Sequence, residues 1–122
     1  MAKRTNQKTN PRLTHLIATL KELARENDAK VWRALAQNLE SPSRNYAEVN
    51  IGKINRYAQD GETILVPGKV LGSGVLNHKV SVAALTFSES AVGKITGLEG
   101  NCMTIEELVQ TNPKGSGVRI LR

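Results

Sequence analysis

A chain of 122 residues with a net charge of +6 is long enough for one domain but too short for a second core. Aromatic residues make up only 3% of it, so its core must be mostly aliphatic. The single Cys102 excludes an intramolecular disulfide and a cysteine-based zinc site, which favours a reducing compartment. The first residues contain no apolar run of seven or more, so nothing there resembles a signal peptide, and no stretch has the run of about 18 apolar residues that a membrane span needs. We therefore expect a cytoplasmic protein without a membrane segment.

The excess of positive over negative charge is confined to the first half of the chain. Residues 1–58 hold 11 Lys and Arg against five Asp and Glu, whereas residues 59–122 hold six of each. The densest part is the start of the chain, where no acidic residue occurs before Glu22 and four cations fall within the first 12 residues: Lys3, Arg4, Lys8 and Arg12. Such blocks repel themselves and become ordered against a polyanion, so nucleic acid is the leading partner. The alternative is a solvated basic tail without a specific partner.

The polar, basic residues 1–9 are interpreted as an arm, and residues 10–122 as a single folded domain. The domain should open with an amphipathic helix, with Asn10 as its N-cap and Pro11 in its first turn. A second helix should have Asp28 as its N-cap and should end before Pro42, because proline disfavours helix at the preceding residue. Trp32 in this helix is predicted to be a core anchor rather than a platform for base stacking.

From residue 47 onward, short β-rich segments alternate with short helices. The expected strands are 49–51, 63–66, 69–71, 79–87, 101–103 and 118–121. Three short helices are expected. The first has Ile54, Tyr57 and Ala58 on one apolar face, and the second has Ser88 as its N-cap and runs to about Thr96. The third begins with a Thr104–Glu107 capping box and ends at Asn112. The alternation predicts an α/β fold, a single domain with helical additions in front of the β-rich part.

The segment 66–76 sets glycines among branched aliphatic residues. Glycine has no Cβ, so Gly72 and Gly74 could present bare N–H groups to a phosphate, and a side chain at Gly72 would block close approach. A plain turn is the alternative. The segment is not a Walker motif, since Val70 follows Lys69 where Ser or Thr is needed, and Asn77 replaces the third glycine of a dinucleotide fingerprint.

No catalytic or metal-binding pattern is found elsewhere. No serine has the frame of a nucleophile elbow, and neither His15 nor His78 has a second ligand at metal spacing. Glu106 and Glu107 are explained by helix capping rather than by acid–base chemistry. We therefore expect no enzymatic activity, no cofactor and no small-molecule substrate.

Several stretches occur in an order that is typical of one family. They are TNPRL at 9–13, AEVNIGKI at 47–54, VPGKVLGSG at 66–74, KVSVAA at 79–84 and NPKGSGVR at 112–119. Together they resemble the archaeal large-subunit ribosomal protein eighteen of the eukaryotic type, over nearly the whole chain from residue 9 to residue 122. The resemblance implies a fold shared with the bacterial-type large-subunit protein fifteen, an α/β fold with an irregular repeated strand-strand-helix core behind the N-terminal helices. It also implies a structural role in the large ribosomal subunit, bound to ribosomal RNA and to neighbouring ribosomal proteins.

Few aromatics and many dispersed cations favour RNA contacts through phosphate, sugar and shape. Three groups are predicted to make them: an arm with Lys3, Arg4, Lys8 and Arg12, a basic face with Arg33, Arg44, Lys53 and Arg56, and the glycine segment with Lys69, Gly72, Ser73, Gly74 and Lys79. Two other classes remain as alternatives, a protein-interaction module and a small nucleotide-utilising enzyme. The basic first half speaks against the former, and the broken phosphate-binding motifs speak against the latter.

Overall fold

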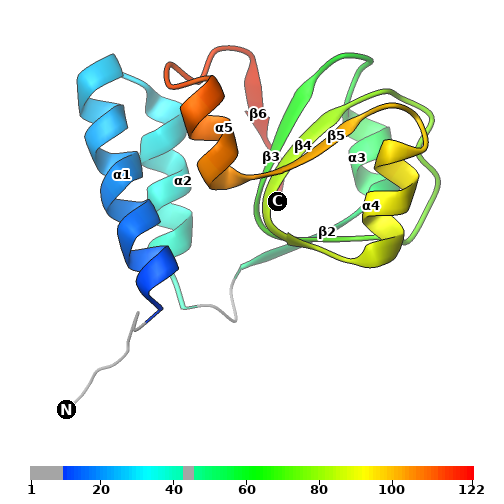
Figure 1. Cartoon of the computed structure of the whole chain (residues 1–122), viewed down its shortest axis with the longest axis horizontal. Coiled ribbons are helices and arrows are strands. Elements are labelled where there is room, and N and C mark those ends of the chain that lie inside the picture. Colours follow the sequence, from blue (N-terminus) through cyan, green and yellow to red (C-terminus); the bar gives the residue numbers. More distant parts are fainter. Residues whose placement is uncertain (1–9, 43–45) are drawn as a thin grey trace.

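The structure is a computed structural model that describes residues 10–42 and 46–122. In these ranges the chain forms five helices and a five-stranded sheet (Figure 1). The helices are α1 (Pro11–Asn27), α2 (Lys30–Glu40), α3 (Ile51–Tyr57), α4 (Glu89–Thr96) and α5 (Ile105–Thr111). The strands are β2 (Ala47–Asn50), β3 (Thr63–Leu71), β4 (Ser81–Phe87), β5 (Asn101–Thr104) and β6 (Val118–Ile120). The predicted α/β class is confirmed, and none of these helices is long and apolar enough to cross a membrane.

Every strand pairing in the sheet is parallel, and β3 lies at its centre. One side of β3 pairs with β4, which pairs in turn with β5, while the other side pairs with β6 near its start and with β2 near its end. Successive residues of β3 enter different cores: Ile64 and Val66 pack in one, and Leu65 packs in the other. Burial on both faces is typical of parallel sheets and explains the nearly continuous aliphatic runs in the sequence.

Helices cover both faces of the sheet. Side chains from α1, α2 and α5 pack against Leu65 and Ala83, whereas side chains from α3 and α4 pack against Val66 and Val82. Trp32 anchors the first of these cores, since it is fully buried and its Nε1 donates a hydrogen bond to the carbonyl oxygen of Pro113 at 2.7 Å. The prediction that Trp32 is a core anchor is therefore confirmed.

Three helix starts are capped as predicted. The side chain of Asn10 accepts a hydrogen bond from the backbone at the start of α1, and the side chain of Ser88 does the same for α4. At α5, Thr104 and Glu107 form the predicted capping box, in which each side chain accepts from the other residue's amide, at 3.1 and 2.7 Å. These signals are local in the chain, which is why the sequence pattern was sufficient to find them.

The junction between α1 and α2 differs from the prediction. Asp28 does not cap α2. It ends α1 in the left-handed conformation, with φ of 51°, and its amide bonds to the carbonyl oxygen of Ala24. Short polar residues such as Asp tolerate this conformation, which satisfies a terminal carbonyl of the helix. The N-cap position of α2 falls to Ala29, which has no side-chain oxygen to offer.

The predicted break between the strands at 63–66 and 69–71 is wrong, because β3 runs without interruption through Pro67 and Gly68. The pairing of β3 with β4 shifts register between Val66 and Lys69. Proline has no N–H group to donate to a neighbouring strand, so within a sheet it is tolerated where the regular hydrogen bonding is already interrupted, as at this register shift. The strand predicted from residue 79 begins at Ser81.

The start of α3 also differs from the prediction. Ile51, expected in a strand, is the first residue of the helix, and its buried stripe consists of Ile51, Ile54 and the following Ala58. This spacing of three and then four residues defines the inner face of a helix. Tyr57 therefore lies off the apolar face on which it was expected, and it is 46% exposed.

Candidate nucleic-acid interface

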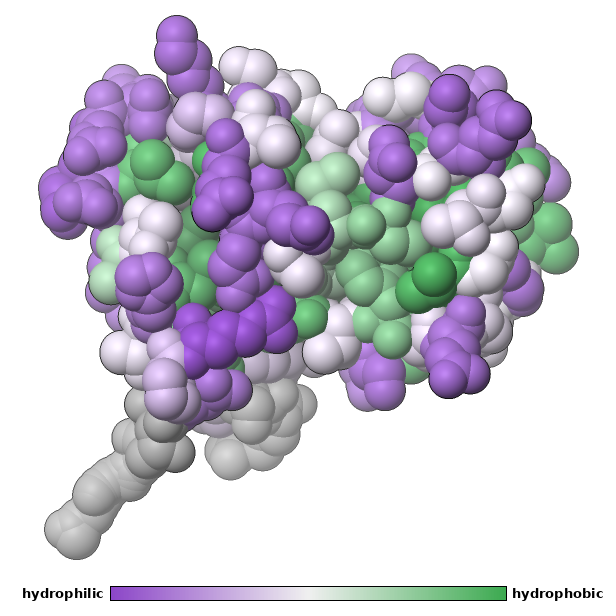
Figure 2. Space-filling view, in the orientation of Figure 1, coloured by the Kyte–Doolittle hydropathy of each residue, from purple (hydrophilic) through white to green (hydrophobic). Residues whose placement is uncertain are grey.

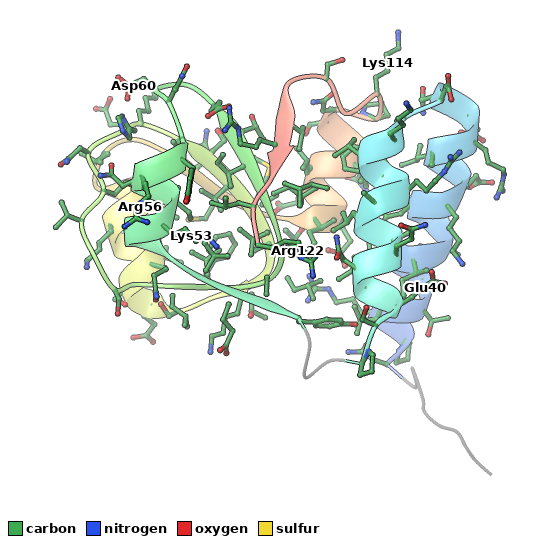
Figure 3. All side chains as sticks on the ribbon, turned by 180° about the vertical axis from the view of Figure 1, so that it is seen from behind. Glu40, Lys53, Arg56, Asp60, Lys114 and Arg122 are labelled. Carbon is green, nitrogen blue, oxygen red and sulfur yellow. The ribbon has the colours of Figure 1, made fainter. Side chains whose placement is uncertain are left out.

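Four residues predicted to contact RNA line one hollow beside α3. Lys53 and Arg56 belong to α3, while Ser73 and Gly74 belong to the loop that follows β3. The hollow has a volume of about 510 Å³, and we call it the α3 hollow. Its remaining lining residues are Asn50, Gly52 and Tyr57. Figure 3 shows the cationic side chains of Lys53 and Arg56 on the outer side of α3.

Helical spacing gathers these side chains on one face of α3. Arg56 and Tyr57 follow Lys53 by three and four residues, so all three lie on the same side of the helix. Ile51 and Ile54 occupy the opposite, buried side. The outward face of this short helix therefore carries two cations and one aromatic ring.

The loop of residues 72–74, called the glycine loop below, is tightly packed between two helices. A Cβ at Gly72 would lie 1.9 Å from Oγ of Ser90 on α4, and one at Gly74 would lie 2.6 Å from Cα of Gly52 on α3. Gly74 also has φ of +99°, which side chains rarely tolerate. The close approach predicted at Gly72 is thus made by α4 of the same chain. Whether an anion also approaches the loop stays a prediction.

Lys94 of α4 holds the glycine loop in place. Its Nζ donates hydrogen bonds to the carbonyl oxygens of Gly72 and Gly74, at 2.5 and 2.7 Å. The carbonyl oxygen of Ser73 accepts from the amide of Gly52 at 2.9 Å. All three carbonyl groups of the loop are therefore satisfied within the protein, while the Ser73 residue remains exposed at the hollow.

The lining of the α3 hollow is positively charged. It includes no carboxylate, and within the described part of the chain Arg56 forms no ion pair. Nζ of Lys53 donates a hydrogen bond to the backbone carbonyl oxygen of Arg122, which brings a third cationic residue to this side of the molecule (Figure 3). An open hollow that is lined by two cations and by no acidic side chain suits a phosphate group.

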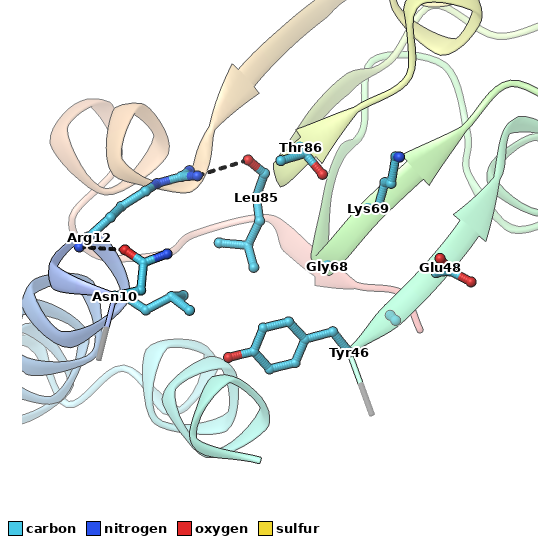
Figure 4. Close-up of a pocket in the computed structure, with 10 residues that line it drawn as sticks. Asn10, Arg12, Tyr46, Glu48, Gly68, Lys69, Leu85 and Thr86 are labelled. Carbon is cyan, nitrogen blue, oxygen red and sulfur yellow. Dashed lines mark hydrogen bonds between the residues drawn. The ribbon is translucent and has the colours of Figure 1, made fainter. Parts of the chain in front are cut away.

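Arg12 and Lys69 lie in a second hollow, of about 440 Å³, between the start of α1 and the sheet (Figure 4). We call it the α1 hollow, and its lining residues are Asn10, Arg12, Leu13, Tyr46, Ala47, Glu48, Gly68, Lys69, Leu85 and Thr86. Nε and Nη2 of Arg12 donate to the carboxylate of Glu106 at 2.7 and 3.0 Å, and its Nη1 donates to the carbonyl oxygen of Leu85 at 3.1 Å. Glu48 stands opposite Lys69 in the β2–β3 register.

The Arg12–Glu106 pair alters the acidity of both partners. The side-chain hydrogen bond from Arg12 lowers the pKa of Glu106, and the same bond raises the pKa of Arg12. Elsewhere, burial raises the pKa of the Cys102 thiol, which disfavours its reactive thiolate form. Within residues 10–42 and 46–122, no three acidic, His or Cys side chains are grouped to hold a metal ion.

Two predicted contacts within the described residues, Arg33 and Lys79, line neither hollow. Arg33 is exposed on α2, and Lys79 is exposed just before β4, with its amide bonded to Oδ1 of Asp60 at 3.1 Å. Four of the predicted contacts lie outside the described residues: Lys3, Arg4, Lys8 and Arg44. Their roles stay predictions.

Two residues at the α3 hollow were not predicted as contacts from the sequence: Tyr57, which lines it, and Arg122, which accepts a hydrogen bond from Lys53. A signal for Tyr57 was present, because the spacing of Ile51, Ile54 and Ala58 already defines a complete inner face without it. No local signal marks Arg122, since it reaches Lys53 across 69 residues of sequence.

Comparison with known proteins places the chain in a family. The model of the family described as "Ribosomal protein 60S L18 and 50S L18e" matches residues 1–122. The chain belongs to this family. Large ribosomal subunit protein eL18 of Methanoregula boonei is 69% identical over 98% of both chains, and that of Methanosphaerula palustris is 66% identical over 95% of this chain and 96% of its own. The Haloarcula marismortui protein of the same name is 53% identical over 94% of this chain and 98% of its own.

Family membership decides between a ribosomal protein and the two alternative classes, a protein-interaction module and a nucleotide-utilising enzyme. A ribosomal protein L18e is a structural constituent of the large ribosomal subunit and works in translation, so the expectation that the chain is not an enzyme is confirmed. The predicted resemblance to the archaeal family is confirmed, and so is the cytoplasmic location, which is that of the large subunit.

Proposed function

We propose that this chain binds and stabilises folded large-subunit ribosomal RNA, and that the α3 hollow is a principal phosphate-binding surface. The observation that carries the proposal is the convergence of Lys53, Arg56 and Ser73 around one open hollow that no carboxylate lines. Membership in a large-subunit family supports ribosomal RNA as the polyanion. Neighbouring large-subunit proteins are the other partners we propose.

Each residue of the hollow has a distinct task in this proposal. The planar guanidinium of Arg56 can donate two hydrogen bonds to one phosphate, and the ammonium of Lys53 acts as a point charge. The hydroxyl of Ser73 can donate to a further phosphate or ribose oxygen. Because Lys94 and the flanking helices already hold the glycine loop, RNA binding has little loop entropy to overcome there.

Stabilisation of RNA follows from charge neutralisation. Phosphates of closely packed RNA helices repel one another, and a rigid cationic surface between them reduces that repulsion. The arm at residues 1–9 and the exposed Arg33 and Lys79 extend the positive surface and add contacts without base specificity. Residues 10–122 act as one domain in this proposal, because the helices on both faces share a single sheet.

Binding of the purified full chain to transcribed large-subunit ribosomal RNA tests the proposal. We expect log K to fall linearly with log salt concentration, with a slope that grows by about 0.7 to 0.9 for each phosphate contacted. Small-subunit ribosomal RNA of similar length serves as the competitor and should bind more weakly. An affinity that is the same at low and moderate salt, or no preference for the large-subunit RNA, would overturn the proposal.

A further inference from the structure

Tyr57 is the exposed member of a small set of aromatic residues. Trp32 is fully buried, whereas Tyr46 and Phe87 are partly buried and pack against the cores. Tyr57 is 46% exposed, and its hydroxyl has no hydrogen-bond partner within the described part of the chain. Neither core packing nor internal hydrogen bonding explains the ring at this position.

The exposed ring of Tyr57 lies beside the cations that are proposed to bind RNA. It lines the α3 hollow and shares its helix face with Lys53 and Arg56, the two cations proposed to bind phosphate. Nη1 of Arg119 donates to its backbone carbonyl oxygen at 3.4 Å, so the end of the helix is tied to the C-terminal segment. An anchored backbone with an exposed ring beside two cations has the composition of a nucleotide-binding site.

We propose that the α3 hollow holds one unstacked nucleotide of the RNA, with its base on the ring of Tyr57 and its phosphate on Lys53 and Arg56. This inference rests on the proposed RNA-binding function. It adds a base contact to a surface for which the sequence predicted only phosphate, sugar and shape contacts.

Three properties of the hollow favour a splayed nucleotide over the backbone of a continuous duplex. The hollow is open, and its volume of about 510 Å³ gives room for a single nucleotide. A duplex presents phosphates and grooves but keeps its base faces stacked, so the ring would have nothing to stack on. Asn50 and Ser73 line the same hollow and can hydrogen-bond to a base edge or to the 2′-hydroxyl.

The test measures the affinity of the full chain for transcribed large-subunit ribosomal RNA over a range of salt concentrations. The variants are Tyr57→Ala, Tyr57→Phe and Arg56→Ala, with Leu98→Ala as the matched control for loss of an exposed apolar side chain outside the hollow. Thermal unfolding of each variant verifies that it is folded. Chemical probing of the bound RNA reports which bases change reactivity.

We expect Tyr57→Ala to weaken binding about tenfold with an unchanged salt slope, since stacking neutralises no phosphate. Arg56→Ala should instead reduce the slope by about one. Tyr57→Phe and Leu98→Ala should bind like the natural protein, and one base should lose its protection in the Tyr57→Ala complex alone.

Two results would overturn the inference, and they are distinguishable. If Tyr57→Ala binds within twofold of the natural protein while Arg56→Ala reduces the salt slope, the hollow binds RNA backbone only, and the proposed function stands without the nucleotide. If the natural protein itself shows no salt-dependent binding, the proposed function fails and the nucleotide site fails with it.

Discussion

The two hollows of this protein contain similar cations in opposite electrostatic settings. In the α1 hollow, Arg12 is held by Glu106. Glu48 stands opposite Lys69 on the neighbouring strand (Figure 4). In the α3 hollow, Lys53 and Arg56 have no carboxylate among the lining residues (Figure 3). Arg12 has already exchanged water for its carboxylate partner, so it gains less from a phosphate than Arg56, which forms no ion pair within the described residues.

The comparison shows that an excess of positive charge in the sequence does not by itself locate a binding surface. Arg12 belongs to the densest cationic block in the chain, yet the structure uses it to tie α1 to α5 and β4. On the face shown in Figure 2, hydrophobic residues gather over the sheet between α5 and α4. The cations of α3 are drawn on the near side of the reverse view (Figure 3).

The largest effect should come from removing the cations of one hollow at a time. The pair Lys53→Ala with Arg56→Ala should weaken binding to large-subunit RNA about 100-fold, because hydrogen bonds between charged groups contribute about 1.5–3 kcal/mol each. The salt slope should fall by about two. The matched pair Arg12→Ala with Lys69→Ala should change both quantities far less. Equal losses for the two pairs would remove the distinction between the hollows.

The next largest effect concerns the packing that builds the α3 hollow. Gly72→Ala should lower the free energy of unfolding by about 2 kcal/mol, because its Cβ would meet Ser90 and would lie 3.0 Å from the amide nitrogen of Ala91. Gly93→Ala is the control, since a Cβ there has no atom within 4 Å, and it should stabilise α4 by up to about 1 kcal/mol. Urea unfolding measures both. A neutral Gly72→Ala would show that the glycine loop is loosely held.

A smaller effect is expected from Lys94, which positions the glycine loop. Lys94→Met removes the donor to the carbonyl oxygens of Gly72 and Gly74 and should cost about 1 kcal/mol of stability. It should also weaken RNA binding severalfold, because Ser73 loses its fixed position. Lys114→Met, which removes an exposed cation that lines neither hollow, should leave both properties unchanged. If the two variants behave alike, Lys94 acts only through its charge.

The smallest effect belongs to the ion pair of the α1 hollow. Glu106→Gln should lower stability by less than about 1 kcal/mol near neutral pH, because the pair is partly exposed. The folded state lowers the pKa of Glu106, so its contribution is complete above the ordinary glutamate value of about 4.3 and is lost as the pH falls through the lowered value. The difference between the variant and the natural protein should therefore disappear in acid. A difference between Glu106→Gln and the natural protein that persisted unchanged in strong acid would contradict this role of the ion pair.

Elements marked by neighbouring residues could be predicted from the sequence. The caps at Asn10 and Ser88 and the Thr104–Glu107 box each depend on residues within one helical turn, and all three form as predicted. The end of α2 before Pro42 is equally local. Two element boundaries were predicted wrongly because the same residue carried signals for two different structures. Asp28 could end one helix or begin the next, and Ile51 could end a strand or begin α3.

The candidate site was predictable only in part, because its character depends on contacts between distant residues. Arg12 pairs with Glu106, 94 positions away in the sequence, and no pattern near Arg12 predicts that partner. The glycine loop lies between α3 and α4, so Gly72 is needed for a contact with Ser90, 18 positions away. Lys53, Arg56, Ser73 and Gly74 were all predicted as contacts, but their meeting in one hollow required the fold.

The most direct test of the central claim is cryo-electron microscopy of large ribosomal subunits that contain this chain. We predict an RNA phosphate oxygen within about 4 Å of the guanidinium of Arg56, at the distance of an ion pair. In the same map, Arg12 should remain on Glu106, with no phosphate on its guanidinium. A map in which Lys53 and Arg56 face solvent or protein while Arg12 binds phosphate would contradict this account.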